Sequence, residues 1–156
     1  MTGILWAITG AALAYGLAQI GSSIGIGYSG QAANGLLSEQ PEKFGLLVIL
    51  VALPGTQGIY GFLAAFLVMM KIGLLGGELA SVSTIQGLQI LAACLPVGLS
   101  CWWSGIHQGK VCAAGVAVAA KKPGDTMKAV IYAALVETYA VLGLVVTIFL
   151  LNGIKL

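Results

Sequence analysis

Four long apolar segments constrain the fold of this chain more than any other feature of its sequence. They cover about residues 4–37, 44–70, 85–120 and 127–151, and each exceeds the roughly 20 residues that a helix needs to cross a bilayer. Only 8% of the residues are charged and 59% are hydrophobic, so a water-soluble domain of this length could not cover its apolar surface. We therefore predict an all-α membrane protein with four transmembrane helices in a lipid bilayer.

The two halves of the chain repeat each other at an offset of about 82 residues. This offset places Pro41 on Pro123 and Gly61 on Gly143. Each half then holds two apolar segments joined by a short proline loop, SEQPEK in the first half and KKPGDT in the second. We expect two tandem-duplicated helical hairpins of the same orientation, over residues 1–75 and 76–156.

The lysines near the segment ends predict the orientation in the membrane. Two of them, Lys71 and Lys155, lie on the side of the termini, and four lie in or beside the proline loops: Lys43, Lys121, Lys122 and Lys128. By the positive-inside rule, the loops that contain Pro41 and Pro123 face the cytoplasm and both termini lie outside. The net charge of +2, without a clustered basic face, gives no indication of nucleic-acid binding.

One carboxylate lies in the middle of an apolar segment. Glu137 stands in IYAALVETYAVLGLVV, where an ionised side chain costs about 2.5–3.5 kcal/mol on insertion scales. A residue of this kind usually faces protein or a water path and has a function. The alternative is a permanently protonated glutamic acid that only joins two helices. The repeat places Glu137 on Gly55, so two hairpins share one membrane carboxylate.

The matching segment of the first half carries polar groups on one helical face. In LPGTQGIYG, the positions of Leu53, Thr56, Gln57 and Tyr60 follow the i, i+3, i+4, i+7 spacing of a single face. Pro54 removes a backbone donor and leaves carbonyl oxygens of the preceding turn free. This face therefore offers a hydroxyl, an amide oxygen, a phenol and backbone carbonyls.

Three of these polar positions share one depth in the membrane. Glu137 lies about 10 residues from its proline loop, and Gln57 and Gln108 each lie about 12 residues from theirs. At 1.5 Å per residue, all three sit about 15–20 Å from the same membrane face. Polar groups scattered only for packing would have no reason to share a level.

One carboxylate and several neutral oxygens suit a hard monovalent cation or a proton. A divalent ion normally requires more carboxylates. With its ion bound, the site is neutral and can face lipid, whereas the empty site is charged and cannot. Because Lys110 is nearer the cytoplasmic end and no other lysine lies at that depth, we expect a counter-charge from another subunit.

Five stretches of the sequence resemble the membrane rotor (proteolipid, c/K) subunits of V-type ATPases, above all the K subunits of bacterial sodium pumps. They are QPEKFG, LPGTQGIYGF, SGIHQGKVCAAG, AKKP and VETYAVLG. The resemblance covers nearly the whole chain. It implies two fused hairpins that assemble into a homo-oligomeric ring, with the first and third helices inside and the other two outside.

The resemblance also implies a set of ion ligands. Glu137 corresponds to the essential carboxylate, and Tyr60 to the tyrosine that hydrogen-bonds it. Na+ would further be held by the Leu53 backbone carbonyl and the side chains of Thr56, Gln57 and Gln108. Pro54 would open the helix locally.

The implied mechanism is rotary and leaves this chain without catalytic chemistry. ATP would be hydrolysed by a separate soluble sector, whose central-stalk subunit turns the ring. A stator membrane subunit would supply an arginine that displaces the ion from Glu137, and half-channels to each side. The implied location is a prokaryotic cell membrane.

Other functions remain open from the sequence. The same rotor could carry H+, which does not require the oxygens of Thr56, Gln57 and Gln108. A stand-alone cation transporter could also be built on a repeated hairpin. A purely structural membrane protein would leave Glu137 unexplained.

Overall fold

The computed structural model describes residues 2–156, and its regular elements are all helices. These are α1 (Thr2–Leu37), α2 (Phe44–Ala52), α3 (Thr56–Lys71), α4 (Thr84–Lys121) and α5 (Thr126–Gly153). Three short 3₁₀ turns complete them: η1 (Pro41–Lys43), η2 (Leu53–Gly55) and η3 (Pro123–Asp125). The turn η2 links α2 and α3 into one continuous span.

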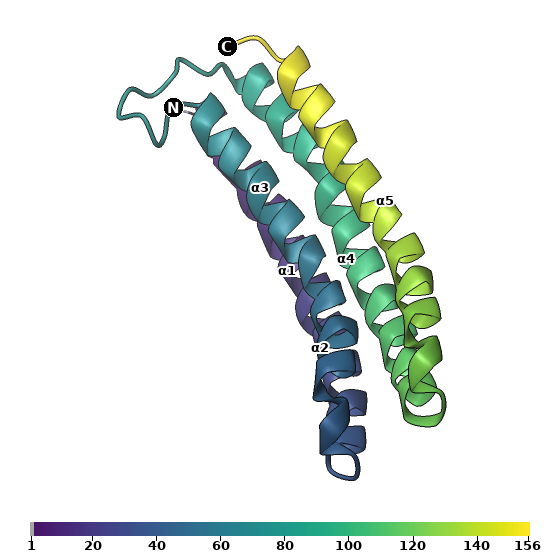
Figure 1. Ribbon diagram of the computed structural model, residues 1–156. Helices are drawn as coiled ribbons and strands as arrows, with labels where there is room; N and C mark the ends of the chain where they lie inside the picture. The colour runs from purple at the N-terminus through teal and green to yellow at the C-terminus, as the bar shows by residue number, and fades with distance from the viewer. Residues whose placement is uncertain (1) are drawn as a thin grey trace.

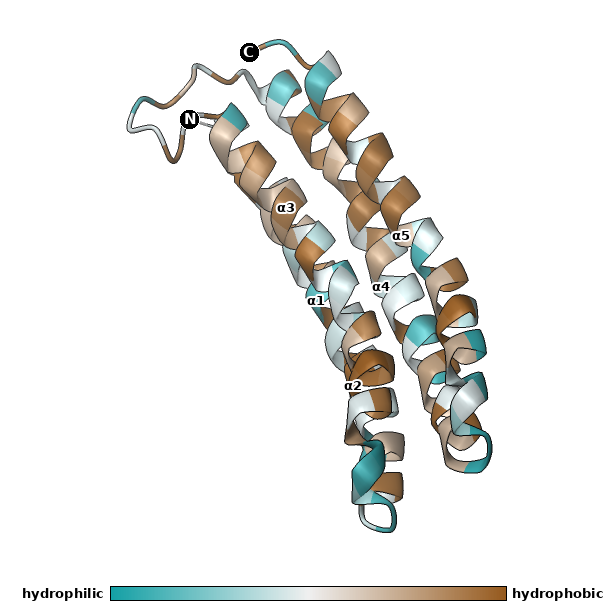
Figure 2. Cartoon of the chain, viewed as in Figure 1, coloured by the Kyte–Doolittle hydropathy of each residue, from teal (hydrophilic) through white to brown (hydrophobic). Residues whose placement is uncertain are grey.

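Within residues 2–156, four helical segments are long and apolar enough to cross a membrane, which confirms the predicted all-α membrane fold. They lie roughly parallel, with both termini at one end and both proline loops at the other (Figure 1). Hydrophobic residues cover most of their length, and hydrophilic residues gather at the loops and at a level within the helices (Figure 2). The chain is therefore an integral multi-pass membrane protein.

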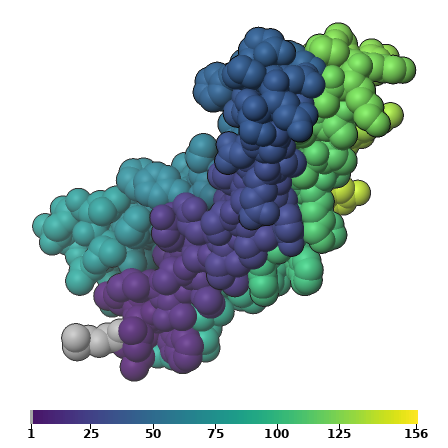
Figure 3. Space-filling view, turned by 90° about the horizontal axis from the view of Figure 1, so that it is seen from below, coloured from purple at the N-terminus to yellow at the C-terminus, as the bar shows by residue number. Residues whose placement is uncertain are grey.

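The helices α1 and α4 form the most extensive contact in the molecule. Glycines on both helices allow their backbones to meet, as small residues do at interfaces between membrane helices. A Cβ on Gly109 would overlap the backbone of Gly25, and a Cβ on Gly105 would lie 2.7 Å from the carbonyl carbon of Gly21. In the space-filling view, α1 runs along one face, in purple and dark blue, with the green second hairpin beside it (Figure 3).

The second helix of each hairpin packs against the first. The span of α2 and α3 lies on α1, and α5 lies on α4. Alanines dominate the core that joins α1 to α3, including Ala7, Ala14, Ala18 and Ala64, all fully buried. Their small side chains keep the helices close, and larger apolar side chains remain on the outside of the molecule, where lipid or other protein can cover them.

Local contacts define the two ends of the bundle. At the loop end, the Lys43 ammonium donates to the backbone carbonyl of Ala120 at 2.6 Å and so ties the two hairpins together. At the opposite end, Ser83 and Gln86 form a reciprocal capping box that begins α4. The connection before it turns at Gly73, whose φ of 74° favours glycine.

Candidate cation-binding site

The span of α2 and α3 is interrupted at Pro54, which lies in η2. Proline has no backbone N–H, so the regular helical ladder cannot continue through this turn. The Leu53 carbonyl instead accepts from the backbone N–H of Thr56 and, at 2.9 Å, from the Thr56 hydroxyl. The N–H of Gly58, in the first turn of α3, donates to the Ser22 hydroxyl oxygen on α1 at 2.8 Å. The break thus brings hydroxyl and backbone groups of α1, η2 and α3 together at one point of the bundle.

Glu137 on α5 is held by side chains from two other helices. The Tyr60 hydroxyl of α3 donates to Glu137 Oε1 at 2.7 Å, and the Gln108 amide of α4 donates to Oε2 at 3.3 Å. Hydrogen bonds to an ionised carboxylate are stronger than bonds between neutral groups. The carboxylate is therefore fixed on both oxygens and half-buried where three helices meet.

Two buried glutamines connect the broken turn to this carboxylate. Gln57 Nε2 donates to Gln108 Oε1 at 2.6 Å, and Gln108 Nε2 also donates to the Ala133 carbonyl at 3.0 Å. Both glutamine side chains are 0% exposed. Because a buried amide without partners is costly, these two residues must bind either one another or a ligand.

The residues singled out from the sequence lie together in one hydrogen-bonded chain. It runs from Leu53 through Thr56 and Gln57 to Gln108 and then to Glu137 and Tyr60, with Thr56 Oγ1 lying 3.5 Å from Gln57 Oε1. The group contains one carboxylate, two amide oxygens, the hydroxyls of Thr56 and Tyr60, and a backbone carbonyl. Hard cations prefer such oxygen ligands, and a single carboxylate balances a single positive charge.

The side chains that bind transition metals or Ca²⁺ are not grouped together in the described part of the chain. Residues 2–156 contain no group of three or more His, Cys, Asp or Glu side chains placed to hold a metal ion. That arrangement would be expected for a transition metal or for Ca²⁺.

Glu137 has no cationic partner within the described chain. The one salt bridge among residues 2–156 joins Lys128 to Asp125 at the loop end. Lys110 is directed elsewhere, since its ammonium lies 5.7 Å from the centre of the Tyr28 ring. A charged Glu137 must therefore obtain its counter-charge from a bound ion, a proton or another molecule.

One side of the carboxylate faces a shallow groove on the outer surface of α5. The groove is lined by Glu137 together with Ala134, Thr138, Val141 and Leu142. The candidate site therefore reaches the outer surface of the molecule at α5.

The sequence patterns did not predict two groups that contribute to the site, the Ala133 carbonyl and the Ser22 hydroxyl. The Ala133 carbonyl holds the Gln108 amide, but a backbone acceptor in a regular helix leaves no trace in the residue type. Ser22 supports the broken turn through Gly58, and its place opposite LPGTQ depends on how α1 packs.

Comparison with known proteins adds an independent line of information. The family model that describes the C subunit of ATP synthase matches the chain twice, at residues 9–68 and 91–150, with starts 82 residues apart. The V-type sodium ATPase subunit K of Enterococcus hirae is 47% identical over 148 residues, which cover 95% of this chain and 91% of that protein. The A-type ATP synthase subunit K of Methanocaldococcus jannaschii is 38% identical over 145 residues, which cover 93% of this chain and 61% of that protein.

Proposed function

Because the chain belongs to the family of the ATP synthase C subunit, the ring-forming membrane proteolipids of rotary ATPases, we propose that it carries Na+ in the rotor ring of a V-type ATPase. It is a non-catalytic subunit, and ATP is hydrolysed by other subunits of the complex. The relative from Enterococcus hirae is a subunit of a sodium ATPase, which favours Na+ as the cargo.

In this proposal, Na+ is bound by the oxygens of the hydrogen-bonded chain. Glu137 supplies the negative charge, and neutral oxygens come from the side chains of Thr56, Gln57 and Gln108 and from the Leu53 carbonyl. Tyr60 and the amide of Gln108 hold the carboxylate in place, as their present contacts support. The Leu53 carbonyl and the Thr56 hydroxyl already lie 2.9 Å apart at the broken turn of Pro54.

Charge neutrality allows such a protein to act as a carrier. With Na+ bound, the site has no net charge and can pass through lipid as the ring turns. Without Na+, the charged carboxylate would have to be paired, since an isolated charge at this depth is costly. We propose that an arginine of a stator membrane subunit pairs with Glu137 and displaces the ion, and that half-channels beside it lead to each side of the membrane.

The partners follow from the same rotary mechanism. Copies of the chain would form the ring, and the central stalk of the ATP-hydrolysing sector would attach at the proline-loop end. The lysines at that end support a cytoplasmic location for the loops of Pro41 and Pro123, with both termini on the outside. The cell membrane of a prokaryote is the proposed location.

The observation that carries the proposal is the contact of Glu137 with Tyr60 and Gln108 inside a membrane-length helix. It is tested by carbodiimide labelling of Glu137 in the purified ring, because this reagent attacks the protonated carboxyl. We expect Na+ to protect Glu137 and each tenfold increase of saturating Na+ to move the labelling midpoint down by about one pH unit, since metal and proton compete for one carboxylate. Labelling that depends on pH but not on Na+ would instead identify a proton-carrying rotor.

A further inference from the structure

We propose that Ser22 of α1 is a positioning residue of the candidate cation site. Its hydroxyl caps the first turn of α3 and so holds the two proposed ligands of that turn, Thr56 and Gln57, in place for Na+. Ser22 itself does not bind the ion. This inference rests on the proposed function, and it adds a residue that lies outside the hydrogen-bonded chain of the site.

The helix α3 has no N-terminal cap within its own span. The first N–H groups of a helix have no partner in that helix, and an N-cap side chain usually accepts a hydrogen bond from the second or third of them. The N-cap position of α3 is Gly55, which has no side chain and whose φ of −78° and ψ of −20° are helical. An N-cap residue normally has an extended backbone, so a side chain at this position would not turn back onto the helix.

Ser22 supplies the missing acceptor from the neighbouring helix. Its hydroxyl oxygen lies 2.8 Å from the backbone nitrogen of Gly58, the third residue of α3. Ser83 makes the same kind of contact at the start of its own helix, where its hydroxyl accepts from the N–H of Gln86, the third residue of α4. Ser22 is only 2% exposed, so water cannot easily replace it. It therefore acts as an N-cap that comes from another helix.

The second half of the chain provides an internal comparison for this contact. An offset of 82 residues places Ser104 at the position of Ser22, and Val136 replaces Pro54. Because α5 continues from Thr126 to Gly153 without a break, the N–H groups in its middle bond within the helix. Ser104 Oγ is the one buried side-chain polar atom among residues 2–156 without a hydrogen-bond partner. The hydroxyl thus has an N–H to bind only where the opposite helix is interrupted.

Close packing holds Ser22 against the broken span. About one turn before Ser22, Ala18 lies so near α3 that a Cβ on Gly61 would overlap it. About one turn after Ser22, a Cβ on Gly25 would lie 2.8 Å from Pro54 Cβ. Neither contact leaves space for α1 to approach the span further. The position of the hydroxyl is therefore set by the backbones of both helices.

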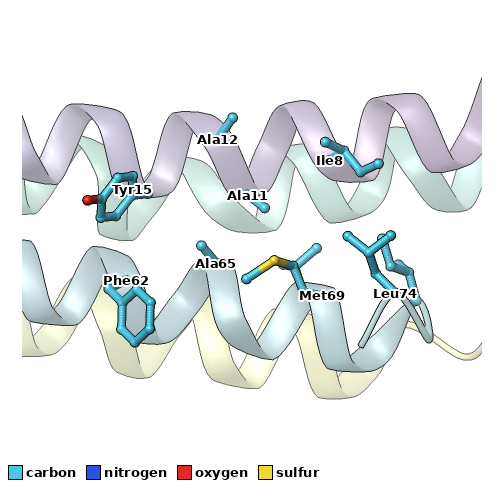
Figure 4. Close-up of a pocket in the computed structure, with 10 residues that line it drawn as sticks. Ile8, Ala11, Ala12, Tyr15, Phe62, Ala65, Met69 and Leu74 are labelled. Carbon is cyan, nitrogen blue, oxygen red and sulfur yellow. The ribbon is translucent and has the colours of Figure 1, made fainter. Parts of the chain in front are cut away.

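The bond from Gly58 to Ser22 is the only hydrogen bond between α1 and α3 within residues 2–156. Toward the termini, apolar and aromatic side chains of the two helices face each other across a groove (Figure 4). There the rings of Tyr15 and Phe62 meet edge to face, with 6.5 Å between their centroids. Burial of apolar surface is non-directional, so the hydrogen bond is the contact that sets how the first turn of α3 faces α1.

The capped turn carries neutral oxygens of the site. Thr56 and Gln57 are the first two residues of α3, and Gln57 donates to Gln108 at 2.6 Å. Tyr60, which binds Glu137, lies in the second turn of the helix. Loss of the cap should therefore loosen the neutral oxygens more than the carboxylate. Na+ affinity should fall, whereas the proton affinity of Glu137 without Na+ should stay the same.

Ser22→Ala in the assembled ring tests the inference, with Ser104→Ala as the matched control. Both changes remove a buried hydroxyl at the same position of the repeat, but only the first removes one that has a partner. We expect Ser22→Ala to raise the Na+ concentration that half-protects Glu137 against carbodiimide by about fivefold, which corresponds to the loss of a typical N-cap. Ser104→Ala should leave this concentration unchanged.

Two further measurements separate positioning from general support of the fold. The pH midpoint of labelling without Na+ should be the same in Ser22→Ala and unmodified rings, because Ser22 is bonded to Gly58 and not to Glu137. If this midpoint moves as well, Ser22 acts on the carboxyl group and the inference is wrong. A lower melting temperature of the ring with unchanged half-protection would also overturn it, since Ser22 would then only stabilise the packing.

The unmodified ring separates this inference from the proposed function. If Na+ does not protect Glu137 there, the sodium-carrying function is refuted and the inference falls with it. If Na+ protects the unmodified and the Ser22→Ala rings at the same concentration, the inference alone is refuted. Should Ser22→Ala rings fail to assemble, Ser22→Cys gives the same comparison with the same expected direction, because its thiol is close in size to the hydroxyl and is a weak acceptor.

Discussion

Replacement of Gln108 by alanine is the most informative single change in the candidate site. It removes the amide that donates to Glu137 Oε2 and the oxygen that accepts from Gln57 Nε2. It also removes one of the proposed neutral ligands of Na+. The residue is completely buried, so water cannot easily take its place.

The size of the effect can be estimated from the lost contact with charge. A hydrogen bond or ligand contact to a charged group contributes about 1.5–3 kcal/mol. At 1.4 kcal/mol per factor of ten, we expect Na+ to bind about 10- to 150-fold more weakly. The change should appear as a higher Na+ concentration for half-protection of Glu137 against carbodiimide, at constant pH.

The control is Gln31→Ala, which removes an exposed glutamine from α1 and should leave the half-protecting concentration unchanged. An intact Gln108→Ala ring with the affinity of the unmodified protein would show that Gln108 does not bind the ion. A change in labelling rate that is equal at every Na+ concentration would show that Gln108 affects the carboxyl group alone.

Three further changes test other parts of the structure. Glu137→Gln should abolish both carbodiimide labelling and ion transport while the ring still assembles, and continued transport would exclude Glu137 as the carrier. Tyr60→Phe removes the 2.7 Å bond to Glu137 and should weaken Na+ protection by tenfold or more, since bonds to charged groups contribute about 1.5–3 kcal/mol. Gly109→Val would drive a side chain into the backbone of Gly25 and should lower the melting temperature of the ring or prevent its assembly, because overpacking costs about 1–3 kcal/mol or more. Gly45→Ala, which meets open space, should leave the melting temperature unchanged or higher, and equal stability of the two glycine variants would contradict the packing of α1 on α4.

The overall fold could be predicted from the sequence because membrane insertion makes strong demands on composition. Apolar length alone identified four spans, and the prolines and glycines that recur at an offset of 82 residues identified the repeat. The placement of Glu137, Gln108 and Gln57 at one depth used only the rise of a helix, and the structure brings these three side chains together.

The remaining contacts depend on how helices rotate about their axes and on backbone groups. Nothing in the residue types shows that the Thr56 hydroxyl binds the Leu53 carbonyl or that Gln108 reaches the Ala133 carbonyl. The bond from Lys43 to Ala120 joins two loops 77 residues apart and depends on the final packing of both hairpins. Such contacts become visible only in three dimensions.

In the proposed rotor, Gly55 stands where a second carboxylate could lie, so each pair of hairpins would carry one ion instead of two. A ring with a carboxylate on every hairpin would move twice as many ions per revolution as a ring of equal circumference made from this chain. If one revolution delivers a fixed amount of free energy, half as many ions means twice the free energy for each ion. In the proposed rotor, the glycine at position 55 would thus favour transport against a steep gradient over transport of many ions.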